Sequence, residues 1–246
     1  MTGESFVSDV SRETPAVPVE ARRVFAVDRL PLAERYADLL ATEGVVRGLI
    51  GPREAPRLWE RHLLNCAVLA ELVPPSANVA DVGSGAGLPG LVLAIARPDL
   101  RVTLVEPLLR RTRFLDEAVE ELGLQGQVEV VRGRAEELAG TRTFDVVTAR
   151  AVAPLERLAR WCLPLVGPGG ELVAMKGASA RAEAEAARPA LTALGCADAV
   201  VVELGLEVLA EPTWAVRLAR PETGPVGWRG RPGRDDGKAR DRRRTQ

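Results

Sequence analysis

Apolar residues recur at spacings of three and four along the first part of the chain and then change to short alternating runs. This pattern predicts two amphipathic helices, over residues 29–47 and 56–73. One stripe of the second helix comprises Leu58, His62, Asn65, Leu69 and Leu72. The pair Pro74-Pro75 ends the helical pattern, because proline cannot continue a helix.

Beyond residue 76, short β-branched runs alternate with helical patterns. The predicted strands cover residues 78–83, 101–106, 127–131, 144–149, 170–175, 198–204 and 213–218. The predicted helices cover residues 88–97, 108–122, 154–165 and 179–194. Such alternation indicates βαβ units. We therefore expect an α/β fold with a mostly parallel seven-stranded sheet, helices on both of its faces, and the N-terminal helices in front.

The chain divides into a body and two tails. Residues 1–28 are rich in Ser, Pro and charge without helical periodicity, and we expect them to be disordered. Residues 29–220 are expected to form a single domain, with helices over 29–75 and the α/β core over 76–220. Residues 221–246 are rich in Gly, Pro and Arg, which predicts a disordered basic tail.

The formal net charge of −1 hides a difference between the body and the C-terminal tail. The tail holds eight Arg and Lys against four Asp and Glu, a net charge of +4, which leaves 25 against 30, or −5, for residues 1–220. Of the 33 basic residues, 31 are Arg, so the abundance of Arg does not by itself indicate phosphate binding. The charge balance therefore does not exclude a nucleic-acid partner.

Several classes of protein are disfavoured by the sequence. The cysteines are Cys66, Cys162 and Cys196. They are scattered and form no CxxC pair, which argues against a disulfide framework and a zinc site. The longest apolar run, residues 88–96, is too short to span a bilayer. No continuous apolar segment typical of a secretory signal is present near the N-terminus. We expect a cytoplasmic monomer without a metal or membrane partner.

A glycine-rich loop follows the first predicted strand and opens a helix. Gly85, Gly87 and Gly90 fit the GxGxxG fingerprint of dinucleotide sites, whereas Asp81 and Gly83 extend the same loop to the DxGxGxG pattern that cradles S-adenosylmethionine. In an open α/β sheet this turn is where a nucleotide-like ligand binds.

Three residues bear on the choice of cofactor. Glu106 ends the second strand and can accept hydrogen bonds from both ribose hydroxyls, which suits either cofactor. The carboxylate of Asp81 suits the cationic methionine end of the methyl donor and would repel a pyrophosphate. A dehydrogenase also needs acid–base residues, and only His62 titrates near neutrality without a strong shift of its pKa. These features favour S-adenosylmethionine over a dinucleotide or a glycine turn that binds nothing.

The end of the fourth strand indicates which nucleophile accepts the methyl group. It lacks the Asn/Asp-Pro-Pro-aromatic tetrapeptide typical of exocyclic amine methylation, and no Pro-Cys nucleophile for pyrimidine C5 follows. Guanine N7 already has a free lone pair and needs no general base, and a basic side chain can hold the neighbouring O6. Arg150 and Lys176, which close the fourth and fifth strands, are candidates for this positioning, although Lys176 could equally cap a loop.

Six short motifs between residues 30 and 215 form a joint pattern. They are Glu60-Arg61-His62-Leu63, the loop from Asp81 to Gly90, Arg110-Arg111-Thr112-Arg113-Phe114-Leu115, Gly133-Arg134-Ala135-Glu136-Glu137, Thr148-Ala149-Arg150-Ala151 and Met175-Lys176-Gly177. In this combination the sequence resembles the ribosomal RNA small-subunit methyltransferase G family, also called glucose-inhibited division protein B. The resemblance implies a Rossmann-like class I methyltransferase fold that uses S-adenosylmethionine.

The resemblance also implies a substrate and cofactor contacts. Members of the family form 7-methylguanosine at position 527 of 16S rRNA, so the implied partner is 16S rRNA or the small ribosomal subunit, with the target guanine splayed out for in-line transfer. The family's cofactor contacts fall on Gly83, Leu88, Ala135, Glu136 and Arg150. The last strand departs from the family, because it lacks an Arg-rich start and terminal lysines.

Alternatives remain open at this point. The chain could methylate an oxygen or nitrogen of a small metabolite, with the N-terminal helices as a lid, or bind RNA at the ribosome without catalysis on a retained cofactor fold. His62 and Asn65 either form a polar pair where their helix docks on the sheet or contact the RNA. Residues 110–113 either bind phosphates or form a solvated helix start.

Overall fold

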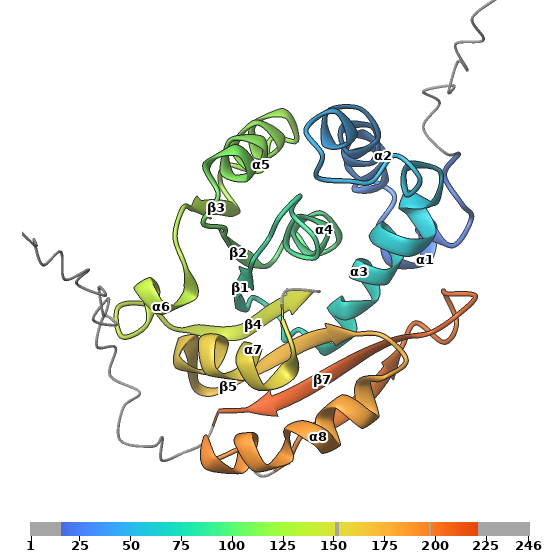
Figure 1. The fold of residues 1–246 in the computed structure, drawn as a ribbon. Coiled ribbons are helices and arrows are strands. Elements are labelled where there is room, and N and C mark those ends of the chain that lie inside the picture. The colour runs from blue at the N-terminus through green and yellow to red at the C-terminus, as the bar shows by residue number, and fades with distance from the viewer. Residues whose placement is uncertain (1–15, 151–152, 197, 221–246) are drawn as a thin grey trace, which may run out of the picture.

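A computed structural model describes residues 16–150, 153–196 and 198–220. One sheet has the strand order β3-β2-β1-β4-β5-β7-β6 (Figure 1). The strands are β1 Asn78–Val82, β2 Arg101–Val105, β3 Val128–Val131, β4 Phe144–Arg150, β5 Val166–Lys176, β6 Val200–Leu204 and β7 Thr213–Ala219. Strands β1 to β5 pair in parallel, whereas β7 is antiparallel to both β5 and β6. The predicted mostly parallel seven-stranded sheet is confirmed.

Helices cover both faces of the sheet, as predicted. Side chains of β4 alternate between the two faces, so Val146 packs in one apolar core and Val147 in the other. The helices that contribute to the first core include α2 Leu30–Leu39, α3 Asn65–Ala67, α4 Gly90–Ala96 and α5 Leu109–Glu121. The helices that contribute to the second core are α6 Ala135–Leu138, α7 Leu155–Cys162 and α8 Ala180–Ala193.

The strand bounds agree with the prediction to within two residues, except at the start of β5. This strand begins at Val166 rather than at residue 170. Its first part contains Gly167, Gly169 and Gly170, a residue type depleted in strands, and the pairing with β4 shifts register between Phe144 and Val146.

The N-terminal helices occupy the predicted ranges, but they are not uniformly α-helical. α2 continues as a π-helical turn over Leu40–Gly44. The second helix is assembled from a 3₁₀ turn Ala55–Arg57, a π-helical turn Trp59–Leu64, α3, and a 3₁₀ turn Val68–Leu72. Leu58 and Leu69 of its predicted stripe are inaccessible to solvent, whereas Leu72 and the polar members His62 and Asn65 are half-buried.

The prediction that residues 1–28 are disordered is wrong for the part that the structure describes. A short helix, α1, spans Ala21–Val24, and the ring of Phe25 packs edge-on against Trp59 at a centroid distance of 6.4 Å. Ala21 and Phe25 are buried. Two apolar anchors are thus enough to order a polar segment too short to show periodicity. Residues 1–15 and the tail 221–246 lie outside the described residues.

Side chains from distant segments join the N-terminal helices to the α/β core. Arg29 donates hydrogen bonds from Nε to the carbonyl of Ile95 at 2.9 Å and from Nη2 to that of Ala94 at 3.1 Å. These carbonyls end α4 and have no partner within the helix. Arg47 forms an ion pair with Glu117 of α5 at 2.5 Å. The N-terminal helices therefore lie against α4 and α5 (Figure 1).

Candidate functional site

The glycine loop lies where the order of the sheet reverses direction. β1 pairs with β2 on one side and with β4 on the other, and the chain leaves these two neighbours toward opposite sides. Ligands of open α/β sheets bind outside the carboxyl ends of the strands at such a point. The loop after β1 has left-handed backbone at Gly83, Gly85 and Gly87, with φ of 73°, 60° and 96°. This conformation favours glycine.

The glycines of the loop have different roles. A Cβ at Gly90 would lie 2.4 Å from Leu104 Cδ2 and 2.8 Å from Asp81 Oδ2, and a Cβ at Gly87 would lie 2.8 Å from Tyr36 Oη. These two glycines allow close packing. A Cβ at Gly85 would meet only the Gly83 carbonyl, at 3.8 Å. Gly85 therefore faces open space, where a ligand can approach the backbone.

Asp81 lies beneath the loop and is inaccessible to solvent. Its Oδ2 accepts a hydrogen bond from the Gly90 N–H at 3.0 Å, while Oδ1 has no partner among the described residues. Burial raises the pKa of this carboxyl to about 7. Half of the carboxyl group thus holds the start of α4, and the other oxygen keeps its hydrogen-bonding capacity.

Glu106 holds the loop from the β2 side. Its side chain is 1% exposed, and Oε2 accepts a hydrogen bond from the Gly85 N–H at 3.0 Å. Oε1 accepts from the Leu108 N–H at 3.1 Å, and Arg111 Nη1 lies 3.4 Å from Oε2. A carboxylate offers about four lone-pair sites. Glu106 can therefore accept a further hydrogen bond while it fixes the loop.

The remaining predicted cofactor residues lie on both sides of this loop. Leu88 is buried in the first core, and Ala135 is buried at the start of α6 in the second core. Glu136, the next residue, is exposed. The Gly133 N–H, just before α6, donates a hydrogen bond to the carbonyl of Glu106 at 3.3 Å. The β3–α6 connection is thus tied to the end of β2.

Arg150, at the end of β4, is paired with His62 from the N-terminal helices. Arg150 Nη1 lies 3.0 Å from His62 Nδ1, and His62 Nε2 lies 3.3 Å from Glu54 Oε2. Burial, followed by the charge of Arg150, lowers the pKa of His62 to about 4. A neutral imidazole accepts a hydrogen bond from the guanidinium N–H at Nδ1 and carries its own proton on Nε2, toward Glu54. Asn65 instead donates to the carbonyl of Arg61 at 3.2 Å.

Lys176, at the end of β5, has protein partners for its ammonium group. Its Nζ lies 2.7 Å from Glu183 Oε1 of α8 and 3.0 Å from the carbonyl of Ala153. The sequence pointed to Lys176 but not to Glu183, Glu54 or Tyr36, whose hydroxyl donates to the Ala86 carbonyl at 2.6 Å. Tyr36 is the one tyrosine of the chain, and that rarity was the one available signal.

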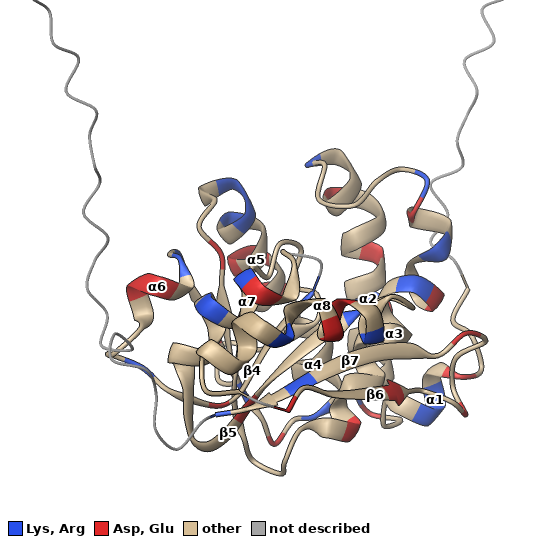
Figure 2. Ribbon diagram, turned by 60° about the horizontal axis from the view of Figure 1, so that its bottom comes forward, with Lys and Arg blue, Asp and Glu red and all other residues tan. Residues whose placement is uncertain are grey.

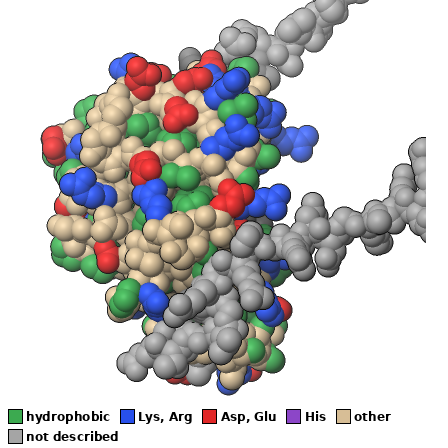
Figure 3. All heavy atoms as spheres, turned by 90° about the vertical axis from the view of Figure 1, so that its left-hand side faces the viewer, with side chains coloured by type: hydrophobic (Ala, Val, Ile, Leu, Met, Phe, Trp, Pro, Cys, Tyr) green, Lys and Arg blue, Asp and Glu red, His purple; other side chains and the backbone are tan. Residues whose placement is uncertain are grey.

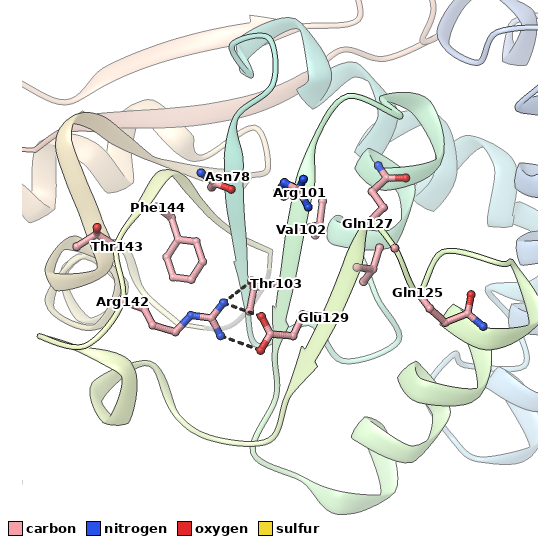
Figure 4. Close-up of a pocket in the computed structure, with 12 residues that line it drawn as sticks. Asn78, Arg101, Val102, Thr103, Gln125, Gln127, Glu129, Arg142, Thr143 and Phe144 are labelled. Atoms are coloured by element: carbon pink, nitrogen blue, oxygen red, sulfur yellow. Dashed lines mark hydrogen bonds and ion pairs between the residues drawn. The ribbon is translucent and has the colours of Figure 1, made fainter.

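A cavity of about 350 Å³ lies at the amino ends of the strands, on the side of the sheet away from the glycine loop (Figure 4). Arg142 points into it and forms an ion pair with Glu129 at 2.6 Å and a hydrogen bond to Thr103 at 3.3 Å. Asn78 and Arg101 come from the starts of β1 and β2. This cavity does not contain the predicted site residues.

Charge does not single out one binding face. Both signs occur along α5 and along the π-helical turn Trp59–Leu64 (Figure 2), and basic and acidic side chains are intermixed on the face in Figure 3. Within residues 16–150, 153–196 and 198–220, no cluster of three or more His, Cys, Asp or Glu could hold a metal ion. No helix in the same part of the chain is long and apolar enough to cross a membrane.

Known proteins are similar to this chain in sequence and in fold. The sequence profile of the rRNA small subunit methyltransferase G family (GidB) matches residues 29–209. A ribosomal RNA small subunit methyltransferase G from Nocardioides sp. is 65% identical over 220 residues, which cover 89% of this chain and 88% of that protein. The protein of the same name from Thermobifida fusca is 53% identical over 228 residues, or 93% of this chain and 96% of that protein.

The fold itself also occurs in a distant methyltransferase. An S-adenosylmethionine-dependent O-methyltransferase from Thermotoga maritima superposes with a TM-score of 0.51 at 14% identity, over 65% of this chain and 66% of that one. This likeness concerns the fold alone. The family profile matches most of the chain, and a named relative is 65% identical over 89% of it. The protein therefore belongs to the rRNA small subunit methyltransferase G family, whose methyl donor is S-adenosylmethionine.

Proposed function

We propose that this protein transfers a methyl group from S-adenosylmethionine to N7 of the guanine at position 527 of 16S rRNA, in the cytoplasm. The observation that carries the proposal is the pair of side chains at the end of β4, next to the glycine loop. There a half-buried guanidinium, that of Arg150, is oriented by the neutral imidazole of His62. This arrangement suits an acceptor that needs a hydrogen-bond donor and no base.

Each nearby group that could serve as a base already accepts a hydrogen bond that holds part of the site in place. His62 accepts a hydrogen bond from Arg150, Asp81 accepts one from Gly90, and Glu106 holds two backbone N–H groups. The described cysteines are buried, and burial raises the pKa of the Cys66 thiol to about 11. Guanine N7 fits these conditions, because its lone pair is free at neutral pH and its neighbouring O6 accepts a hydrogen bond from Arg or Lys.

The residues around the loop fit the methyl donor. The open space at Gly85 and the unpartnered Oδ1 of Asp81 offer a cradle and a buried acceptor. When bound, S-adenosylmethionine supplies a methyl group on a cationic sulfur. We assign the donor contacts to Asp81, Gly83, Gly85, Leu88, Glu106, Ala135, Glu136 and Arg150. The carboxylates attract the positive charge of the donor, and the glycines let the backbone approach it.

The target guanine must leave its stack to reach this site, because base edges inside a folded RNA are not accessible to a buried strand end. Arg150, whose guanidinium has five N–H donors, can hold O6 while it remains bonded to His62. The enzyme then contributes alignment and the exclusion of water.

Methylation with labelled donor tests the proposal. Purified protein is incubated with labelled S-adenosylmethionine and 16S rRNA, and strand scission specific for 7-methylguanosine locates the label. We expect scission at position 527 alone. Label in small molecules only would instead indicate a metabolite methyltransferase. Tight cofactor binding without transfer would indicate a non-catalytic RNA-binding protein, and either result would contradict the proposal.

A further inference from the structure

The ammonium of Lys176 and the carboxylate of Glu183 form an ion pair at the edge of the site, with Nζ 2.7 Å from Oε1. The side chain of Lys176 is 11% exposed and that of Glu183 is 27% exposed. This pair is better shielded from water than Arg188–Glu185, which lies on the same helix with side chains 65% and 66% exposed. Shielding strengthens an ion pair and raises the cost of removing one partner.

Both members of the pair also bind the backbone at the start of α7. The Leu155 N–H, at the first position of α7, donates to Glu183 Oε1 at 2.7 Å. Lys176 Nζ donates to the carbonyl of Ala153 at 3.0 Å. Two hydrogen bonds from two different elements thus hold the backbone on either side of Pro154.

This backbone belongs to the acceptor side of the site. Met175 pairs in register with Arg150, the residue proposed to donate a hydrogen bond to guanine O6. Lys176 therefore lies one residue beyond Arg150 along the strand ends. We propose that Glu183 and Lys176 are positioning residues, which tie the start of α7 to the end of β5, the strand that pairs with β4 at Arg150. The inference rests on the proposed function, because it assigns the pair to the geometry of the acceptor. In this inference Lys176 does not contact guanine directly but acts through the backbone that it holds.

The two partners are not equivalent, and this asymmetry makes the inference testable. Among the described residues, loss of the Glu183 carboxylate leaves the Leu155 N–H without an acceptor and Lys176 with the Ala153 carbonyl alone. Loss of the Lys176 ammonium leaves the hydrogen bond from Leu155 to Glu183 in place. Glu183→Leu should therefore be the more damaging change, and Glu183→Gln, which keeps a carbonyl oxygen, should be milder.

The experiment compares Glu183→Leu, Glu183→Gln and Lys176→Met with the control Glu185→Leu, which removes an exposed carboxylate from the same helix. We expect kcat for 16S rRNA to fall about 10- to 100-fold in Glu183→Leu and less in Lys176→Met and Glu183→Gln, since small misplacements of reacting groups have effects of this order. The Kd for S-adenosylmethionine and the KM for rRNA should stay within about twofold of wild type. The control should leave kcat unchanged.

Amide hydrogen exchange gives a readout that does not depend on activity. Exchange at Leu155 should accelerate in Glu183→Leu and remain slow in Glu183→Gln and in the control. Wild-type kcat in Glu183→Leu would overturn the inference, as would an equal loss of cofactor affinity and kcat. If Glu183→Leu does not fold, Lys176→Met decides: a kcat below wild type with slow exchange at Leu155 supports the inference, and a wild-type kcat overturns it. A wild-type protein that does not methylate 16S rRNA would refute the proposed function, whereas the exchange at Leu155 would still report on the pair.

Discussion

The two halves of the sheet hold their site residues by opposite means. On the side of β1 to β3, carboxylates accept hydrogen bonds from backbone N–H groups, as Asp81 does from Gly90 and Glu106 from Gly85. On the side of β4 and β5, the residues at the strand ends are cations held by side chains of other elements. Arg150 is paired with His62, 88 positions earlier, and Lys176 with Glu183 of α8.

Because of this difference, substitutions in the two halves should have different effects. Backbone hydrogen bonds fix the path of the glycine loop, so changes there should act on the donor and on stability. Side-chain pairs fix the orientation of single cations, so changes there should act on the acceptor and on pH dependence. A variant on the side of β1 to β3 that changes acceptor use or pH dependence would contradict this division, as would a variant on the side of β4 and β5 that changes donor binding.

The largest effect is expected from Gly85→Leu. A side chain at this position fills the open space before the loop, and we expect the affinity for S-adenosylmethionine to fall at least about 100-fold, equal to about 2.7 kcal/mol, in calorimetry. Gly123→Leu is the matched control, because Gly123 has φ of 66° and no atom within 4 Å of its Cβ position. Both variants carry the strain of left-handed backbone, about 1–2 kcal/mol. Equal cofactor affinity in the two would remove the loop from the donor site.

Gly90→Ala should act on stability rather than on one ligand contact. The new Cβ would lie 2.4 Å from Leu104 Cδ2 and 2.8 Å from Asp81 Oδ2, so the base of the loop must shift. We expect urea unfolding to show a loss of about 2 kcal/mol, as for overpacked cores. Gly126→Ala, with no atom within 4 Å of its Cβ position, should cost nothing measurable. A Gly90→Ala protein as stable as this control would mean that the loop is not tightly packed against Asp81.

His62 should make the acceptor side sensitive to acid. Its pKa is lowered to about 4 in the folded state from an ordinary value of 6.5, so between these values the unfolded chain binds more protons and stability falls as pH falls. Arg150 and Arg61 oppose protonation and Glu54 favours it. Between pH 7 and 4.5 the wild type should lose on the order of 2 kcal/mol relative to His62→Gln.

The measurement is the difference in unfolding free energy between these two proteins across the pH range. Asp81 has a raised pKa and changes stability in the opposite direction, because its folded state binds the extra proton. That contribution is common to both proteins and cancels in the difference. A difference that does not vary with pH would show that His62 is not held neutral by its surroundings.

The fold could be predicted because its signals are local. Alternation of apolar positions places β1 to β4 to within one residue, and the glycines and Glu106 stand at fixed offsets along the chain. The prediction places the start of β5 too late, because its glycines contradict strand propensity. Only the pairing with β4 reveals the full strand. Propensity is a weak guide where tertiary pairing decides.

The candidate site was predictable only in part, because its second layer of residues depends on tertiary contacts. Arg150 stands at a strand end and could be singled out, but nothing in the sequence near Glu54 or Glu183 shows which side chain each will meet. Phe25 shows the same limit, since its partner Trp59 lies 34 positions further along the chain. Such partners become visible only when the helices are placed on the sheet.

The smallest effect is expected where the donor half meets RNA. Arg110 is exposed in the first turn of α5, and a single phosphate contact there would lower the slope of log affinity against log salt by about 1 in Arg110→Gln. Arg101→Gln is the control, because Arg101 is exposed at the amino edge of the sheet, away from the glycine loop. Filter binding of 16S rRNA over a salt series measures both slopes. If Arg101→Gln changes the slope as much as Arg110→Gln does, the RNA does not distinguish the two edges, and only the acceptor side, through Arg150, would then orient the substrate.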